Sequence, residues 1–292
     1  MTAHTQMNTS HGTSNPGKLQ DREFKMFSSF IQERTGIQLP PAKKTMLESR
    51  LQKRLKVLGI GSFPEYARYA FSPDANHAEL THMIDVVTTN KTDFFREPNH
   101  FEYLTTAVLP EISRRRGNNP AHPIRIWSAG CSTGEEPYTL AMVLADYTER
   151  NHGFRYSILA SDICTNVLET ARTAIYQEDR ASGIAAETKK KYLLRSKDRK
   201  RHLIRICPQL RSQIEFRRIN FMDPDFGLDT RFDIIFCRNV VIYFDKPTQE
   251  ALINKFHHEL NPGGFLFLGH SESLNGIDVK FNSVASTVYK KI

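Results

Sequence analysis

The centre of the chain contains the segment Ile124-Arg-Ile-Trp-Ser-Ala-Gly-Cys-Ser-Thr-Gly-Glu-Glu-Pro-Tyr138. Its first residues are typical of the end of a buried strand, and the small residues from Ala129 to Gly134 predict a tight turn. From Glu135 to Tyr147 the apolar residues recur at helical spacing. A strand, a turn without bulky side chains and a helix predict the first unit of a nucleotide-binding α/β sheet, with a ligand against the turn and the helix N-terminus.

The residues of this turn do not match the common phosphate-binding loops. The turn is not a G-x-G-x-x-G motif, and it lacks the lysine of a P-loop. Glu135 and Glu136 suit the dipole of the helix that they open, but they would also repel a pyrophosphate and can face an ammonium or sulfonium cation. Asp162 ends the next predicted strand, where its carboxylate could accept both hydroxyls of a ribose or, alternatively, cap the following helix.

From residue 123 onward, strand and helix patterns alternate. Further strands are predicted at Tyr156–Asp162, Ile214–Asn220, Phe232–Asn239, Phe265–His270 and within Ser283–Lys290, with helices at Asn166–Ile175 and Pro247–Leu260. The sequence Asn261-Pro-Gly-Gly264 predicts a turn between the last of these helices and the strand after it. This order predicts a parallel, doubly wound α/β sheet that binds its ligand at the carboxyl ends of the strands.

One interval interrupts the alternation. Between Tyr176 and Ser212, two short apolar runs flank the polar, basic turn 196–202, which predicts an inserted β-hairpin rather than a crossover helix. We therefore expect a small antiparallel β-subdomain over about residues 176–212, within an α/β domain that spans residues 118–292.

The N-terminal part of the chain has a different pattern. Residues 1–18 are rich in Thr, Ser, Asn and His and predict a disordered tail, whereas residues 19–88 predict an all-α domain. Residues 89–117 predict a capped linker and a helix that ends in three arginines. In the linker, Arg96 follows Phe94 and Phe95; this pattern is compatible with an ordinary linker, or with an arginine that faces a ligand.

The helix predicted from Lys43 to Leu58 has a leucine stripe on one side and basic residues on the other. The basic residues are Arg50, Lys53, Arg54 and Lys56. Such a face is usually solvated, but Glu48 is the only acid among these bases. A docking surface for an acidic helix is therefore an alternative hypothesis.

Composition limits the function classes. The chain has 292 residues, of which 39% are hydrophobic and 25% charged, as in a globular protein, and it contains neither a secretory signal nor an apolar run that could span a membrane. The net charge of +8 favours a polyanionic partner: nucleic acid, an anionic membrane or an acidic protein surface. The widely spaced Cys131, Cys164, Cys207 and Cys237 predict buried reduced thiols in a cytoplasmic protein, and no metal site is evident.

Five motifs, taken together and in order, resemble the chemotaxis receptor methyltransferases of the CheR family. These motifs are Thr88-Thr-Asn-x-Thr-x-Phe-Phe-Arg-Glu97, Trp127-Ser-Ala-x-x-Ser-Thr-Gly-Glu-Glu-Pro-Tyr138, Ala160-Ser-Asp-Ile163, Phe236-Cys-Arg-Asn-Val-x-Ile-Tyr-Phe244 and Gly269-His-Ser-Glu272. The similarity runs from about Phe24 to the end of the chain. It implies a Rossmann-like class I methyltransferase domain, with the β-subdomain inserted and the all-α domain in front.

The resemblance also implies a reaction and a site. A methyl group passes from S-adenosyl-L-methionine to glutamate side chains on the cytoplasmic helices of methyl-accepting chemoreceptors, giving glutamyl methyl esters and S-adenosyl-L-homocysteine. The catalytic positions nearest the incoming carboxylate are Arg96 and Tyr243. The positions implied to bind the cofactor are Asn90, Thr92, Arg96, Ala129, Gly130, Glu136, Asp162, Asn220, Phe221, Arg238 and Asn239. The helix that carries Arg50 corresponds to the receptor-contacting helix of the family.

The residues support this chemistry independently. A glutamate is ionised at neutral pH, so its methylation needs no general base, and the sequence has no obvious His/Asp pair. The enzyme must instead place a carboxylate oxygen in line with the methyl group, and the guanidinium of Arg96 is well shaped to orient a carboxylate. Tyr243 is expected to help position the substrate.

One feature of the sequence departs from the family pattern, and two alternative functions are compatible with the sequence. Members that tether to a receptor's C-terminal pentapeptide have a glycine-rich β-subdomain turn, and residues 196–202 contain no glycine, which puts tethering in doubt. The net charge and the basic hairpin motivate an RNA methyltransferase as an alternative, although no aromatic residues lie among the hairpin bases to stack on nucleotides, and we predict no nucleic-acid partner. The second alternative is a non-catalytic module that binds S-adenosylmethionine.

Overall fold

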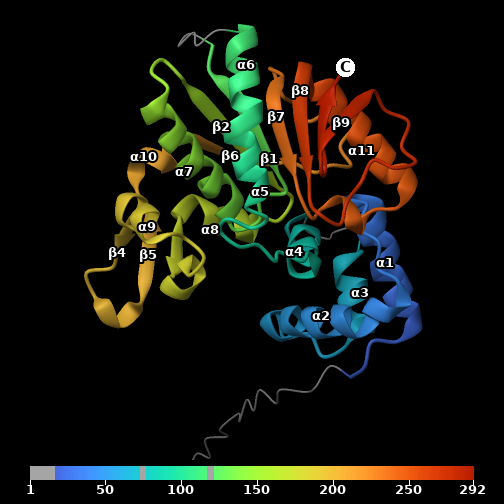
Figure 1. Ribbon diagram of the computed structural model, residues 1–292. Coiled ribbons are helices and arrows are strands. Elements are labelled where there is room, and N and C mark those ends of the chain that lie inside the picture. The colour runs from blue at the N-terminus through green and yellow to red at the C-terminus, as the bar shows by residue number, and fades with distance from the viewer. Residues whose placement is uncertain (1–16, 73–76, 117–121) are drawn as a thin grey trace, which may run out of the picture. The chain divides into compact units, whose positions relative to one another are not determined.

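The computed structural model describes residues 17–72, 77–116 and 122–292. The described residues form two compact units, one within 17–33 and 39–87 and the other within 34–38 and 88–292 (Figure 1). The first unit is helical and the second is an α/β unit. The tail predicted at residues 1–18 lies, but for its last two residues, outside the described part of the chain.

The helical unit contains the helices that the apolar spacing predicts. They are α1 (Asp21–Thr35), α2 (Lys44–Leu58), α3 (Phe63–Ala70) and α4 (His77–Val87), with the 3-10 turn η1 (Pro41–Lys43) before α2. Gly59 ends α2 in the left-handed conformation, at φ 69°, and the side chain of Ser62 accepts a hydrogen bond from the backbone N–H of Glu65 to cap α3. The leucines of the α2 stripe, Leu47, Leu51 and Leu55, are completely buried.

The α/β unit is built on a seven-stranded sheet with the order β6-β2-β1-β7-β8-β10-β9 (Figure 1). The strands are β1 (Ile124–Ala129), β2 (Tyr156–Asp162), β6 (Ile214–Arg218), β7 (Phe232–Cys237), β8 (Leu260–Leu268), β9 (Phe281–Ala285) and β10 (Val288–Lys291). The first five strands of this order pair in parallel, whereas β10 pairs antiparallel with β8 and β9. The sheet is therefore mixed, with the predicted parallel part and an antiparallel edge.

Helices cover both faces of this sheet, which confirms the doubly wound fold. On one face, α7 (Glu135–Arg150), α8 (Thr165–Thr173) and α6 (Leu109–Arg116) pack on Ile126, Ile158, Ile234 and Phe236. On the other face, α11 (Lys246–Glu259) packs on Trp127, Leu159, Ile235 and Leu266. Neighbouring residues of one strand thus belong to opposite cores, as the period of two in a strand dictates.

Two details at the end of the chain differ from the prediction. Asn261-Pro-Gly-Gly264 lies within β8, where the pairing with β7 skips from Leu260 to Phe265 and Gly263 has φ 67°. The segment is therefore an irregularity inside a strand rather than a turn between elements. The tail forms two strands instead of one, because the chain reverses near Thr287, at φ 54°, and β9 pairs with β10.

The inserted β-subdomain is confirmed and contains one strand more than the hairpin. Strands β4 (Leu193–Arg195) and β5 (Leu203–Ile206) form the predicted antiparallel hairpin, and β3 (Ile175–Gln177) pairs with β5 on its other side. The predicted helix therefore ends at Thr173, two residues before Ile175. The remaining elements of the insertion are η3 (Glu178–Ala181), α9 (Ala186–Tyr192), η4 (Arg199–Arg201) and α10 (Pro208–Arg211).

Three further predictions can be compared with the structure. The predicted helix that ends in three arginines is continuous but consists of α5 (Asn99–Tyr103), the π-helical turn η2 (Leu104–Val108) and α6. All four cysteines are buried and free, as predicted. None of the helices in residues 17–72, 77–116 and 122–292 has the length and apolar content that a bilayer span requires.

Candidate active site

The carboxyl ends of β1 and β2 lie beside the segment that precedes α5. The backbone N–H of Ser132, in the turn after β1, donates to the Asp162 carboxylate at 2.9 Å, and the Ser132 hydroxyl donates to the carbonyl of Asn90 at 3.1 Å. The side-chain amide of Asn90 lies 3.8 Å from the sulfur of Cys164 and 3.3 Å from the Thr88 hydroxyl. These contacts bring three of the five motifs to one edge of the sheet.

The turn after β1 is tightly constrained. Gly130 has φ 83°, and a Cβ at this position would lie 2.5 Å from a methyl carbon of Val240. Gly134 has φ 98°, and a Cβ there would lie 2.9 Å from the Tyr176 hydroxyl. Ser132 is also left-handed, at φ 51°. The small residues are therefore required by the close approach of neighbouring elements and by backbone conformation.

Asp162 is buried at the end of β2, and its carboxylate organises two loops. One oxygen accepts from Ser132 N–H, and the other accepts from Cys164 N–H at 3.0 Å. The residue at the start of α8 is Cys164, whose own side chain forms no cap, so the bond from its N–H to Asp162 keeps the capping alternative open. The buried carboxylate thus connects the turn after β1 to the start of α8.

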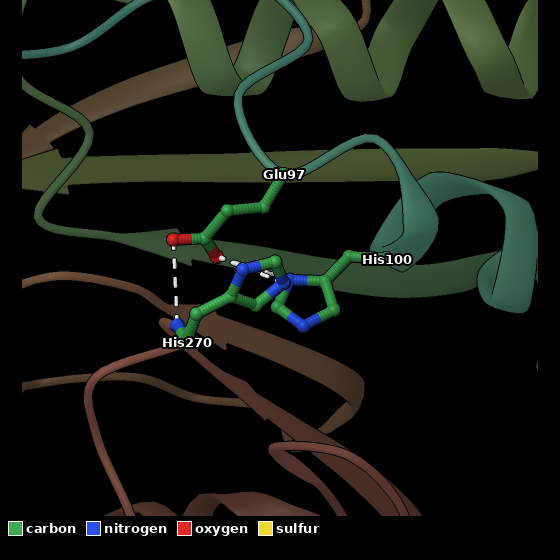
Figure 2. A group of neighbouring side chains, drawn as sticks. All are labelled: Glu97, His100 and His270. Atoms are coloured by element: carbon green, nitrogen blue, oxygen red, sulfur yellow. Dashed lines mark hydrogen bonds and ion pairs between the residues drawn. The ribbon is translucent and has the colours of Figure 1, made fainter.

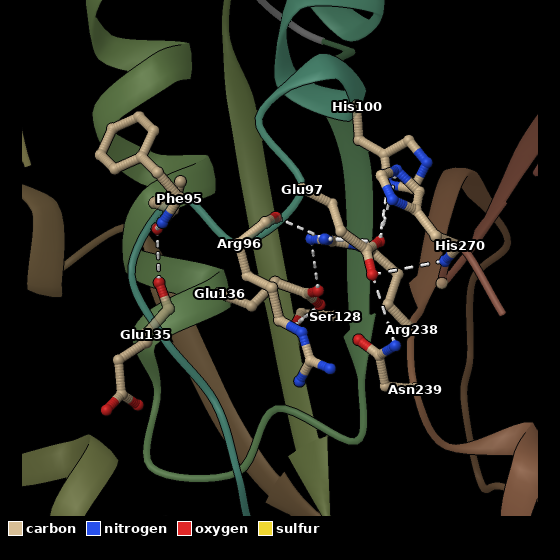
Figure 3. A network of polar contacts seen from close by, with 12 residues as sticks. Phe95, Arg96, Glu97, His100, Ser128, Glu135, Glu136, Arg238, Asn239 and His270 are labelled. Carbon is tan, nitrogen blue, oxygen red and sulfur yellow. Dashed lines mark hydrogen bonds and ion pairs between the residues drawn. The ribbon is translucent and has the colours of Figure 1, made fainter. Parts of the chain in front are cut away.

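A buried ionic network lies where β7 ends (Figure 3). The Arg238 side chain is 2% exposed and donates to Glu97 Oε2 at 2.9 Å, to Glu136 Oε2 at 3.2 Å and to the carbonyl oxygen of Arg96. Burial alone would raise the pKa of Glu97, but the hydrogen bond and charge of Arg238 outweigh it and hold this pKa below its usual range. Arg238 therefore fixes the backbone around Arg96.

The two glutamates at the start of α7 point to different partners. Glu136 accepts from the Ser128 hydroxyl at 2.7 Å and from Arg238, and burial raises its pKa despite that cation. Glu135 is buried and pairs with Arg180 of the insertion at 2.6 Å. Of the two acids, Glu136 belongs to the network at the sheet edge, whereas Glu135 holds the β-subdomain.

The backbone around Arg96 adopts an unusual conformation. Phe95 and Glu97 have φ 55° and 56°, a region that residues with a Cβ rarely adopt. The Phe95 N–H donates to Thr139 at 3.1 Å, and Arg238 holds the Arg96 carbonyl. The half-exposed Arg96 guanidinium donates to the Lys91 carbonyl at 3.0 Å. The surrounding structure therefore maintains a strained conformation on both sides of this arginine.

The loop after β7 is held by a second buried carboxylate. Glu272 accepts from the backbone N–H groups of Asn239, Val240, Ile242 and Gly269, at 2.7 to 3.2 Å. Burial nevertheless raises the pKa of Glu272, because desolvation outweighs these bonds. Asn239, at φ 59°, directs its side-chain amide to Glu97 at 3.4 Å. Four backbone donors on one carboxylate fix the end of β7 relative to the loop after β8.

The other positions implied by the resemblance lie around this edge of the α/β unit. Thr92 and Ala129 are buried, and the carbonyl of Thr92 accepts from Arg180 at 2.5 Å. Asn220 donates to the Arg34 carbonyl at 2.7 Å, and the Phe221 ring lies 6.4 Å from the ring of Trp127. Tyr243 ends the 3-10 turn η5 (Val241–Tyr243), and its carbonyl accepts from Gln38 N–H at 2.9 Å. The binding and catalytic roles of these residues stay predictions.

In the helical unit, the four basic residues of α2 are not equivalent. Arg54 is 16% exposed and donates to both oxygens of Glu79, and Arg50 donates to the Val87 carbonyl. Lys53 and Lys56 are exposed. The predicted docking face thus includes two arginines with partners inside their own unit and two lysines that are available on the surface.

Sequence reasoning assigned no role to four residues that the structure brings into the site. These residues are Glu97, His100, His270 and Glu272. Glu97, His270 and Glu272 stand inside the motifs quoted above, so the motifs carried a signal, but nothing in the sequence indicates their partners. Arg238 and Glu97 are separated by 141 positions, and only the fold brings them together.

These residues fit the cofactor that the resemblance implies. A buried aspartate ends β2, small residues form the turn after β1, and two carboxylates with one guanidinium leave a formal charge of −1 at the end of β7. The acid matches a ribose, and the negative charge matches a sulfonium or ammonium group. The site also lies at the carboxyl ends of the parallel strands, where doubly wound sheets bind their ligands.

The fold and the site define a class of protein, an α/β methyltransferase that binds S-adenosylmethionine, and comparison with known families agrees. The family model described as "CheR methyltransferase, SAM binding domain" matches residues 90–290, and "CheR methyltransferase, all-alpha domain" matches residues 22–88. The chain belongs to the CheR family. It is a chemotaxis protein methyltransferase that uses S-adenosylmethionine.

Curated relatives match over nearly their whole length. The chemotaxis protein methyltransferase of Borreliella burgdorferi is 41% identical over 270 residues, covering 92% of this chain and 94% of that protein. Those of Salmonella typhimurium and Escherichia coli are 38% and 37% identical, each covering 93% of this chain and 90% and 91% of the relatives. Among solved structures, PKMT2 from Rickettsia typhi in complex with AdoHcy matches at 17% identity and a TM-score of 0.31, over 50% of this chain and 20% of that one, too low a likeness to carry an argument.

Proposed function

We propose that the protein methylates glutamate side chains on the cytoplasmic helices of methyl-accepting chemoreceptors, forming glutamyl methyl esters. The observation that carries this proposal is the presentation of Arg96 beside the buried acids. The half-exposed guanidinium stands next to the formally anionic network of Arg238, Glu97 and Glu136. A cationic methyl donor suits the acids, and an anionic acceptor suits the arginine.

The chemistry of a carboxylate acceptor agrees with the groups at this edge. A glutamate is ionised at neutral pH, so no side chain has to remove a proton from it. S-adenosylmethionine supplies the methyl group when it is bound. In the proposed transfer, the carboxylate oxygen would take the methyl group as the C–S bond breaks, and the electron pair of that bond would stay on the sulfur of S-adenosylhomocysteine. The contribution of the chain is orientation, which can lower a barrier by roughly 7–11 kcal/mol.

Arg96 is proposed to orient the substrate carboxylate, with Tyr243 as a second positioning group. An arginine that gripped both carboxylate oxygens would also reduce the reactivity of the nucleophile. The present geometry suits a looser contact, because one nitrogen of the guanidinium is already bonded to the Lys91 carbonyl at 3.0 Å. Asp162 is proposed to accept the ribose hydroxyls, and Glu136 to face the positive charge of the donor.

Receptor contact is proposed for the exposed lysines of α2 and not for a pentapeptide tether. Lys53 and Lys56 offer two exposed charges, which suits an acidic helix. In the β-subdomain, the hairpin turn contains the 3-10 helix η4, whose start is capped by Asp198 accepting from Lys200 N–H at 3.1 Å. This compact basic turn differs from a glycine-rich one and supports the doubt about tethering.

Labelled methyl transfer tests the proposal. Receptor-enriched membranes are incubated with the protein and S-adenosylmethionine carrying a tritiated methyl group, and the product is treated with base. We expect volatile labelled methanol, because an ester is base-labile. Arg96→Ala should reduce kcat about a hundredfold while the affinity for S-adenosylhomocysteine, measured by calorimetry, changes less than threefold. Base-stable label, or label in RNA, would exclude glutamate esters as the product.

A further inference from the structure

Three side chains from distant parts of the chain converge beside the ionic network. Figure 2 shows Glu97, His100 and His270, which come from the segment before α5, from α5 itself and from the loop after β8. Glu97 Oε2 lies 3.5 Å from His100 Nδ1 and 3.9 Å from His270 Nε2. One potential ligand atom of each residue lies within 4.8 Å of the other two, and this is the only such group found in the described ranges of the chain.

The tautomer of His100 decides what this group can bind. Nε2 of the ring lies 2.9 Å from the Thr287 hydroxyl, which can accept from it or donate to it. Nδ1 is buried and has no hydrogen-bond partner within the described part of the chain. When the Thr287 hydroxyl accepts from Nε2–H, Nδ1 carries a lone pair. The 2% exposed His100 side chain therefore directs this lone pair at a carboxylate.

Two acceptors that face each other in a buried place would be stabilised by a positive charge between them. A lone pair and a carboxylate oxygen at 3.5 Å repel one another, and no water can reach Nδ1 without displacing protein atoms. His270 completes the group from the surface, because its side chain is 48% exposed; binding an ion at Nε2 would replace the 3.1 Å hydrogen bond of this atom to the Asn99 side-chain oxygen. The geometry thus combines a buried ligand, a shared carboxylate and a half-exposed ligand with access to solvent.

We propose that Glu97, His100 and His270 bind a divalent transition-metal ion, with zinc the best match to the donors. Two imidazoles and one carboxylate are a common zinc ligand set that leaves a further position for water. Metal–ligand distances of about 2.0–2.1 Å place two tetrahedral ligands about 3.4 Å apart. The 3.5 Å and 3.9 Å separations from Glu97 Oε2 are close to this, so only small side-chain movements are needed.

Arg238 sets the expected strength of the site. Its Nη2 donates to the same Glu97 oxygen at 2.9 Å, and its positive charge weakens the binding of a cation. Glu136 offsets this charge from the other side of the guanidinium. We therefore expect a dissociation constant in the micromolar range. A bound ion would connect the segment that carries Arg96 to the loop after β8 and hold both in place.

Zinc titration of the full-length protein tests the site. The protein is stripped with a chelator, dialysed and titrated with zinc chloride in a calorimeter, without cofactor or receptor. We expect one zinc ion per chain, and His270→Ala should weaken its binding at least tenfold. The matched control is His258→Ala, a histidine whose side chain is 75% exposed on α11, which should bind zinc like the wild type.

Cobalt provides a second readout that does not depend on stability. Co²⁺ in the same site should give the intense visible absorption of a four-coordinate ion, and this absorption should be lost in His270→Ala. Equal zinc binding by the wild type and His270→Ala would mean an adventitious ion only, held for example by His4 or His11. That result, or no binding at all, overturns the proposal and leaves the proposed methyl transfer untouched.

Discussion

The two units of the molecule each contain a buried arginine–carboxylate cluster, and the two clusters differ in balance. In the helical unit, Arg54 donates to Glu79 at 3.1 Å, and the Tyr66 hydroxyl donates to the same carboxylate at 2.7 Å. One cation is paired with one acid, and a neutral hydroxyl donor adds a further hydrogen bond to that acid. In the α/β unit, Arg238 meets two acids, Glu97 and Glu136, and the cluster keeps an excess of one negative charge.

The clusters also differ in the backbone around them. Arg54, Tyr66 and Glu79 lie within regular helices, whereas Arg238 holds the carbonyl of a residue between two left-handed neighbours and precedes the left-handed Asn239. Burial of a charge therefore does not by itself mark a site. Excess charge together with maintained backbone strain is what separates the candidate active site from a cluster that only stabilises its unit.

Among the substitutions in the two clusters, Arg238→Met is expected to have the largest effect on stability and activity. The change leaves two carboxylates side by side without their cation, so we expect a loss of about 3–5 kcal/mol in the free energy of unfolding, measured with urea. Binding of S-adenosylhomocysteine and methyl transfer should both disappear, because the Arg96 backbone loses its anchor.

The triple variant Arg238→Met, Glu97→Gln, Glu136→Gln separates the two effects. Removing the unpaired charges should restore most of the stability, while methyl transfer should stay absent. If the triple variant methylated receptors at the wild-type rate, the network would have no part in the function, and the excess charge would lose its meaning.

Local patterns of the sequence predicted much of this site but not the cluster itself. The strand, turn and helix from Ile124 onward predicted the sheet edge, and the polar turn 196–202 predicted the hairpin. The strand at Ile175–Gln177 was missed because its three residues gain strand structure only by pairing with β5. The left-handed conformations of Phe95 and Glu97 have no local signature, since tertiary contacts such as the Arg238 bond to the Arg96 carbonyl maintain them.

The pH dependence of stability gives a further test of the cluster in the α/β unit, because His100 lies beside it. Burial first, and then the charge of Arg238, lowers the pKa of His100 to about 4, from an ordinary value of 6.5. The unfolded chain then binds a proton below about pH 6.5 that the folded chain binds only near pH 4, so stability falls as the pH falls through this window. Between pH 7 and pH 5, in chelator, we expect a loss of about 2 kcal/mol from this residue.

His100→Gln is the control for the pH experiment. The variant lacks the titrating group, so its unfolding free energy should fall by about 2 kcal/mol less than that of the wild type between pH 7 and pH 5. The control is needed because burial raises the pKa of Glu136. A raised carboxyl pKa favours the folded chain at low pH, and this contribution to stability is lost as the pH rises. Its effect is therefore opposite in sign to that of His100. Parallel pH profiles for the two proteins would contradict the assignment of the window to His100.

Arg54→Met gives the smallest expected effect and tests the balanced cluster directly. Glu79 keeps the hydrogen bond from Tyr66, and Arg54 is 16% exposed, so water can partly replace the guanidinium. We expect a loss of about 1–2 kcal/mol in the free energy of unfolding and an unchanged affinity for S-adenosylhomocysteine. A higher KM for receptor would place Arg54 on the docking face with Lys53 and Lys56. A lost affinity for S-adenosylhomocysteine would instead mean that the balanced cluster also supports the cofactor site. The distinction between the two clusters would then fail.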